Sequence, residues 1–115
     1  NRTPPAPVED LGVVPLDHNR LAVYWRKNRE PDMAMYWVHR SREPDFEASG
    51  KTQVGAVYPG RYEYAVYYDT AVRAGETWYY KVFPVDCAGN AQTASDCAEG
   101  RAPSRERYPS RRLQA

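Results

Sequence analysis

The fold of this chain of 115 residues is decided by one stretch, Tyr67 to Asn90, which reads YYDTAVRAGETWYYKVFPVDCAGN. A short run of strand-forming residues ends at Asp69, and the chain then bends at Ala74–Gly75. A longer run of aromatic and β-branched residues extends from Thr77 to Val85, and Gly89–Asn90 supplies a turn after it. We therefore expect two strands separated by a bend, with the rest of the chain packing against this unit as further strands.

The composition agrees with an all-β protein. Ten tyrosines and three tryptophans are punctuated by ten prolines and seven glycines, a mixture typical of many short strands in a sandwich or barrel. The length suits one domain. No apolar run approaches the roughly 18 residues that a membrane span needs. Any targeting segment is expected to have been removed or to lie outside this sequence.

The charge is small overall and uneven along the chain. A net charge of +1 argues against a nucleic-acid-binding domain, which usually carries a basic face. Arginines gather after residue 100, where five of them face a single acid, Glu106. We interpret residues 1–6, which are rich in proline, as a linker, residues 7–102 as the domain, and residues 103–115 as a basic tail or linker. A docking arm for an acidic partner is the alternative for the basic segment.

Alternation along the predicted strands separates a core from an outer face. Strands are expected at Val8–Pro15, with Pro15 confining it to an edge or a break, at Leu21–Trp25, at Met33–Ser41 and at Gln92–Ala98. The residues predicted to face the core are Leu21, Val23, Trp25, Tyr36, Val38, Trp78, Tyr80 and Val82. The residues predicted to form an exposed patch on two neighbouring strands are Met35, Trp37, Tyr79 and Phe83.

Two further expectations follow from the same alternation. Between residues 61 and 69, simple hydrophobicity directs Tyr62, Tyr64, Val66 and Tyr68 inward. His39 is expected at the surface beside Trp37.

The chain has two cysteines, Cys87 and Cys97, which flank nine residues around the Gly89–Asn90 turn. An even count at hairpin spacing suits a disulfide in an oxidising compartment, with two reduced thiols as the alternative. A zinc site is not expected, because His18 and His39 lie far away in sequence and zinc takes four ligands.

The pattern resembles a fibronectin type III domain of the kind found as an accessory module in secreted bacterial, carbohydrate-active enzymes such as glycoside hydrolases. The resemblance extends from about residue 5 to residue 102. Its motifs are Pro5-Ala-Pro7, Leu21-x-Val23-x-Trp25, Tyr36-x-Val38-x-Arg40, Tyr67-x-Asp69-Thr70-x-Val72, Gly75-x-x-Trp78-x-Tyr80-x-Val82 and Ala88-Gly89-Asn90. The resemblance implies a seven-stranded, immunoglobulin-like Greek-key sandwich with strand orders A-B-E and C′-C-F-G. It also implies that Tyr67 points inward, against the alternation above.

Three departures from the family pattern stand out. Trp78 occupies a position where the family usually has a tyrosine that bonds back to the bend. Pro84 stands where alanine is usual. A Cys87–Cys97 disulfide would be a local addition across the last hairpin.

The resemblance implies a non-catalytic module of a larger secreted or extracellular protein. The module would act as a spacer or pack against a neighbouring domain or a protein partner through the exposed patch. The first alternative is a carbohydrate-binding module in which Trp37 and Tyr79 stack on a polysaccharide. The second is an adhesion domain of a cell-surface receptor.

We expect no enzyme activity, cofactor or metal. Asp69 and Asp86 form the one carboxylate pair to consider, and we interpret Asp69 as the cap of the turn before the bend and Asp86 as an anchor for the last hairpin. A calcium site from Asp86, Asn90 and Asp96 fits on ligand type alone. No nucleic-acid partner and no membrane span are expected.

Overall fold

The computed structural model describes residues 5–30, 32–87 and 97–104. These residues form no helix, and so none that could cross a membrane. The strands are β1 (Glu9–Asp17), β2 (Arg20–Arg26), β3 (Met33–Ser41), β4 (Gln53–Val57), β5 (Tyr64–Asp69), β6 (Thr77–Asp86) and β7 (Ala98–Arg101). The all-β prediction is confirmed.

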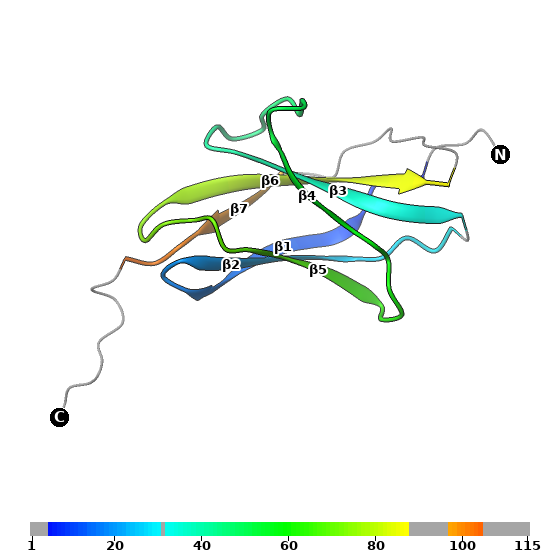
Figure 1. The fold of residues 1–115 in the computed structure, drawn as a ribbon, viewed down its shortest axis with the longest axis horizontal. Helices are drawn as coiled ribbons and strands as arrows, with labels where there is room; N and C mark the ends of the chain where they lie inside the picture. The colour runs from blue at the N-terminus through cyan, green and yellow to red at the C-terminus, as the bar shows by residue number, and fades with distance from the viewer. Residues whose placement is uncertain (1–4, 31, 88–96, 105–115) are drawn as a thin grey trace.

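Two antiparallel sheets pack face to face (Figure 1). One has the strand order β1-β2-β5 and the other the order β4-β3-β6-β7. These are the A-B-E and C′-C-F-G orders of the Greek-key sandwich, so the predicted architecture is confirmed. Strands β3 and β6 are central in the larger sheet. In the smaller sheet β2 is central, and β1 and β5 form its two edges.

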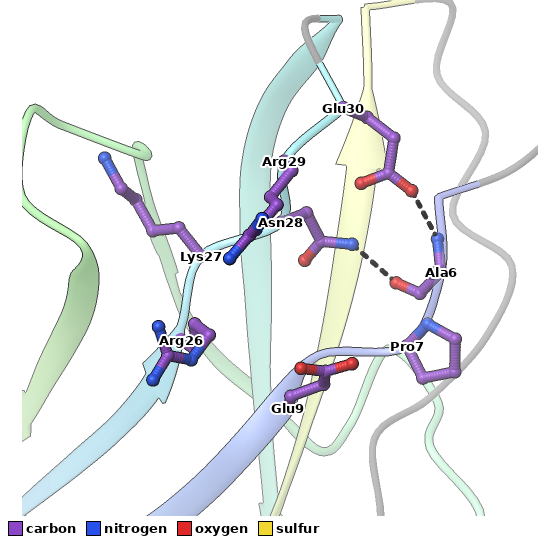
Figure 2. A pocket seen from close by; sticks show the side chains of 8 residues that line it. All are labelled: Ala6, Pro7, Glu9, Arg26, Lys27, Asn28, Arg29 and Glu30. Atoms are coloured by element: carbon purple, nitrogen blue, oxygen red, sulfur yellow. Dashed lines mark hydrogen bonds between the residues drawn. The ribbon is translucent and has the colours of Figure 1, made fainter.

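The segment that leads into β1 is tied to the loop between β2 and β3 (Figure 2). The Ala6 N–H donates to Glu30 Oε2 at 2.9 Å, and the Asn28 side-chain amide donates to the Ala6 carbonyl at 2.6 Å. A hollow of about 430 Å³ lies beside these bonds and is lined by Ala6, Pro7, Glu9 and residues 26–30. Its wall carries three bases, Arg26, Lys27 and Arg29, and two acids, Glu9 and Glu30, so it presents charges of both signs to a ligand.

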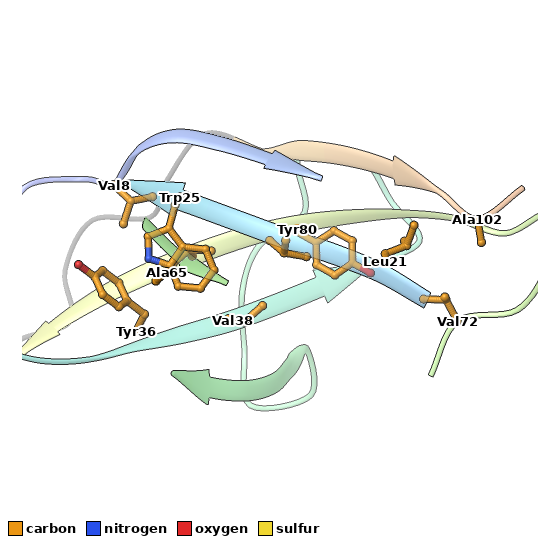
Figure 3. Close-up of a cluster of buried hydrophobic side chains, with 11 residues drawn as sticks. Val8, Leu21, Trp25, Tyr36, Val38, Ala65, Val72, Tyr80 and Ala102 are labelled. Atoms are coloured by element: carbon orange, nitrogen blue, oxygen red, sulfur yellow. The ribbon is translucent and has the colours of Figure 1, made fainter. Parts of the chain in front are cut away.

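The core lies between the sheets and extends along their length (Figure 3). All but one of the residues predicted to face the core are fully buried; the exception, Trp78, is half-buried and packs against the cluster. The Trp25 and Tyr36 rings meet edge to face, with centroids 5.3 Å apart, a favoured geometry for aromatic pairs. Burial of this apolar area supplies most of the stability of such a domain.

The expected orientation of β5 is wrong. Ala65 and Asp69 are buried and Tyr67 packs against the core, whereas Tyr64 and Tyr68 are 39% and 60% exposed. Tyr62, before the strand, is exposed as well. Asp69 points inward because an arginine and a tyrosine hydroxyl of the opposite sheet donate hydrogen bonds to its carboxylate. The tyrosines can point outward because the hydroxyl end of a tyrosine ring tolerates water. The inward Tyr67 that the family resemblance implied is the one observed.

Strand boundaries shift at both ends of the chain. The first strand begins at Glu9 and continues through Pro15 to Asp17, and Pro15 does lie on an edge strand. The last strand is Ala98–Arg101, later than the predicted Gln92–Ala98, most of which falls outside the described residues. The predicted domain limits, residues 7 and 102, enclose all seven strands and stay a prediction.

Candidate interaction surfaces

The predicted patch lies on the outer face of the larger sheet. Trp37 on β3 stands directly opposite Phe83 on β6. Met35 and Tyr79 lie farther along the same strands, opposite Val85 and Ser41. All four side chains are half-buried, so they share one face but do not project as an open apolar surface. That they mediate contact stays a prediction.

A hollow of about 250 Å³ opens beside Trp37 and Phe83. Its remaining wall comes from the turn region between β3 and β4 and from the start of β4. The lining residues are Trp37, His39, Ala48, Ser49, Gly50, Gln53 and Phe83. An aromatic floor with a polar rim can receive one apolar or amphipathic group.

His39 forms part of this floor and is not the surface residue that the sequence predicted. Only 6% of it is exposed. Its ring meets Phe83 edge to face with centroids 5.1 Å apart, and Nδ1 lies 2.8 Å from the Thr52 hydroxyl oxygen. Burial lowers the pKa of His39 below its ordinary value. The ring is therefore a neutral packing element of the hollow.

A second surface, not predicted, covers the outer face of the smaller sheet. Its exposed apolar side chains are Val14, Leu16, Tyr64 and Tyr68, and Tyr58 and Tyr62 are exposed in the segment that leads to β5. Tyr24 lies over Gly12, where a Cβ would overlap its ring, and its centroid is 6.3 Å from that of Tyr64. The family pattern could have revealed this face, because it directs Tyr67 inward. Side chains alternate along a strand, so an inward Tyr67 places Tyr64 and Tyr68 on the outer face.

Asp69 and Asp86 do not form a catalytic pair. Asp69 lies beside Tyr80, whereas Asp86 is six positions farther along β6, about 20 Å away at the usual rise of a strand. Glycosidase carboxyl pairs lie within about 10 Å of each other. Both residues are buried.

The environment of Asp69 is structural. Its Oδ2 accepts bonds from the Tyr80 hydroxyl at 2.6 Å and from Arg40 Nη1 at 2.7 Å, and its Oδ1 accepts from the Ala71 N–H at 3.1 Å. The last bond is the predicted turn cap. Burial and the adjacent carboxylate raise the pKa of Tyr80 far above its ordinary value, so its hydroxyl stays a donor.

Trp78 replaces the tyrosine contact of the family with a different one. Its indole N–H donates to Glu76 Oε1 at 3.0 Å, at the bend itself. The guanidinium groups of Arg40 and Arg42 lie 3.9 and 5.1 Å from its ring centroid, which is cation–π range. The bond back to the bend is thus made by a nitrogen donor.

The predicted disulfide is not formed, because Cys87 and Cys97 are both free thiols. Cys97 Sγ accepts a bond from the Asp45 N–H at 3.4 Å, and Cys87 is exposed just after β6. The sulfur of Cys97 therefore faces the turn after β3. The described residues contain no group of three side chains able to hold a metal, and Asn90 and Asp96 of the considered calcium site lie outside them.

Comparisons with known proteins define the fold. No family model matches the sequence, and no curated protein matches it. Solved structures do match. The sixth fibronectin type III domain of a human fibronectin type III domain containing protein is 18% identical, with a TM-score of 0.68 over 96% of each chain. An Fn3-like protein from Clostridium thermocellum is 24% identical, with a TM-score of 0.69 over 84% of this chain and 92% of that one.

A larger protein also contains the same unit. The FN1–FN3 domains of chicken CNTN1 match with a TM-score of 0.70 at 15% identity. That match covers 88% of this chain and 33% of the other, as expected when one domain aligns within a series of three. Strand order, sheet pairing and these matches together establish that the chain has the fold of a fibronectin type III domain.

Proposed function

We propose that this chain is a non-catalytic fibronectin type III module of a larger secreted protein, and that it holds a neighbouring domain or a protein partner through the outer face of β3 and β6. The observation that supports the contact site is the cross-strand pair of Trp37 and Phe83 beside a hollow. The secreted setting rests on the family resemblance of the sequence.

The size of the hollow favours a protein partner. About 250 Å³ is below the range of roughly 300–1,000 Å³ in which small-molecule sites usually fall, but it accommodates one large side chain. Interfaces are commonly dominated by one or a few such anchors that sit among aromatic residues. Since the patch is already half-buried, little of its side-chain freedom would be lost on contact.

Sugar binding is a second candidate for the same hollow. Trp37 offers a ring face on which the C–H surface of a sugar can stack, and Ser49 and Gln53 on the rim offer hydrogen bonds. Tyr79, the second platform that the sequence suggested, does not line the hollow. A single ring platform suits one sugar unit rather than an extended polysaccharide.

The test compares Trp37→Ala with Tyr62→Ala, the truncation of an exposed aromatic side chain that precedes β5. Both are made in the longest natural chain that carries the module, and calorimetry follows the unfolding of its domains. If the module packs on a neighbouring domain through Trp37, only Trp37→Ala should make the module and its neighbour unfold in two separate thermal transitions. Equal behaviour of the two variants would overturn the proposed contact site.

A glycan array distinguishes the second candidate. The wild-type domain and Trp37→Ala are compared after circular dichroism has shown that both are folded. Binding of a sugar that disappears in Trp37→Ala assigns the hollow to carbohydrate. Absence of binding leaves protein contact as its proposed role.

A further inference from the structure

The free edge of β5 has a defined hydrogen-bonding phase. Residues of β5 pair with β2 in unbroken register, from Leu21 opposite Asp69 to Arg26 opposite Tyr64. One step beyond, the Lys27 N–H donates to the Glu63 carbonyl at 2.9 Å. In an antiparallel pair, hydrogen-bonded residues alternate with non-bonded ones, so the odd-numbered residues of β5 direct their backbone groups to β2. The even-numbered residues, Tyr64, Val66 and Tyr68, direct theirs to the open edge.

This edge lacks the features that protect sheet edges. The other edge strand of the same sheet, β1, carries Pro15, two register irregularities and Asp10 at a φ of 59°. In the larger sheet, the edge strand β4 contains Gly55 and its pairing with β3 shifts register. Strand β5 has no proline, no glycine, no bulge and, between Tyr64 and Tyr68, no charge.

We propose that β5 pairs with β5 of a second copy of this chain, antiparallel about a two-fold axis at Val66. This interface is separate from the hollow at Trp37 and does not depend on the proposed function. Val66 then faces Val66 of the second copy, and Tyr64 faces Tyr68. The residues in these three pairs are the ones whose backbone N–H and C=O groups point to the open edge of β5. Each such pair exchanges two N–H···O bonds, so the three pairs provide about six.

The side chains complement one another in this register. On the outer face, valine faces valine and tyrosine faces tyrosine, which are favourable cross-strand pairs. On the inner face, Ala65 lies opposite Tyr67 of the second copy, so a small side chain meets a large one. A shift of the register by one residue would place inward side chains opposite outward ones, which makes the Val66-centred arrangement the natural one.

Charge does not oppose this pairing. The acids at the two ends, Glu63 and Asp69, approach each other across the axis. Each already has its own arginine partner: Glu63 pairs with Arg26, and Asp69 with Arg40 at 2.7 Å. The residues between them are neutral, so no unpaired like charges meet.

The pairing is weak on its own. One edge of six residues buries less than the roughly 1,000 Å² of a stable interface. The dimer should be weak, with a dissociation constant between about 10 μM and 1 mM. We therefore expect a monomer at low concentration and a dimer at high concentration.

Sedimentation velocity between about 10 μM and 1 mM tests the proposal directly. The wild-type domain should shift toward a dimer across this range. Val66→Pro should stay monomeric yet remain folded, because the N–H that it removes points away from β2 and proline is tolerated at such an edge position. Val66→Lys, which keeps the N–H, should also stay monomeric and replaces the proline variant if that one unfolds.

A matched control is Val14→Lys on β1, the opposite edge strand, where Val14 is 43% exposed. This variant should dimerise as the wild type does. A wild type that is monomeric at about 1 mM, or equal loss of the dimer in Val14→Lys and Val66→Lys, would overturn the proposal. Neither result bears on the hollow at Trp37.

Amide hydrogen exchange by NMR provides the register. At low concentration, Tyr64, Val66 and Tyr68 should exchange quickly while Ala65 and Tyr67 are protected. At high concentration the first three should become protected, by about twofold when half of the chains are dimeric and by about tenfold when nine-tenths are. Protection that increases at other edges instead would assign the dimer to another surface and refute this one.

Discussion

The two ends of the core achieve burial in different ways. At one end, Trp25 packs edge to face on Tyr36, and its indole N–H is buried with no hydrogen-bond partner among the described residues (Figure 3). At the other end, beside Leu21 and Tyr80, the Asp69 carboxylate is 2% exposed and accepts three hydrogen bonds. The first end relies on apolar area and shape, and the second on a complete polar network.

The difference predicts opposite tolerance to substitution. A buried donor without a partner already costs free energy in the folded state, so its removal loses little. A satisfied buried ion pair adds little net stability compared with an apolar replacement, but removal of one member leaves the other charge stranded. The two ends should therefore respond to polar deletions with effects of different size and sign.

The largest effect is expected from Asp69→Ala. This change strands the Arg40 guanidinium, whose side chain is only 16% exposed, and leaves the Tyr80 hydroxyl without its acceptor. The free energy of unfolding should fall by about 3–5 kcal/mol. Urea or guanidinium denaturation followed by tryptophan fluorescence measures it.

The matched control for that deletion is Asp17→Ala, which removes an ion pair with Arg20 at the surface. Solvent screens this pair, so only a small loss is expected. If the two variants lose similar amounts, the proposed contrast between a buried network and a surface pair is wrong.

An intermediate effect is expected from His39, a buried ring with Thr52 as its hydrogen-bond partner. Burial lowers its pKa in the folded chain, whereas in the unfolded chain the pKa is about 6.5. The unfolded chain therefore takes up the proton first as the pH falls. Stability should be constant above about pH 7.5, decrease as the pH falls through about 6.5, and level off below the folded-state pKa.

His39→Gln serves as the test of this pH dependence. Glutamine can still bond to Thr52 but does not titrate, so the decrease between about pH 7.5 and 5 should become shallower. The free energy of unfolding is measured at several pH values for both proteins. An unchanged slope would assign the dependence to another titrating group.

The smallest effect is expected at the other end of the core. Chemical synthesis can replace Trp25 with benzothienylalanine, in which sulfur stands in place of the indole N–H. Because that N–H has no partner among the residues that the structure describes, stability should stay within about 0.5 kcal/mol or rise. The same replacement at Trp78 should be destabilising, since its N–H bonds to Glu76. A clear loss at Trp25 would reveal a partner for its N–H.

Much of this organisation follows from alternation in the sequence, and the exceptions have physical causes. Met33–Ser41 was predicted with the limits observed, because a run of apolar and aromatic residues begins there directly after a polar stretch of the sequence. The orientation of β5 was mispredicted because its tyrosines are amphipathic and because Asp69 is drawn inward by Arg40 and Tyr80, which are distant in sequence. No local pattern encodes such partners.

The surfaces were less predictable than the core. Trp37 and Phe83 were placed on one face by their parity, which is a local property. The hollow beside them depends on the turn after β3, and the burial of His39 depends on Thr52 in that turn. The conformation of a turn depends on particular residues at particular positions and not on alternation. The hollow therefore could not be derived from the spacing of apolar residues alone.

The placement of the first and last strands has a mechanical consequence. Val8 and Ala102 lie at opposite ends of the buried cluster (Figure 3), so tension applied to the chain at these two residues would pull β1 and β7 along their own lengths. Hydrogen bonds of antiparallel strands are perpendicular to the strands, so such a pull loads the bonds of each ladder together instead of opening them one at a time. The bonds from Ala6 to Asn28 and Glu30 would carry load before β1 does. A domain built in this way extends little under force until a whole strand slips.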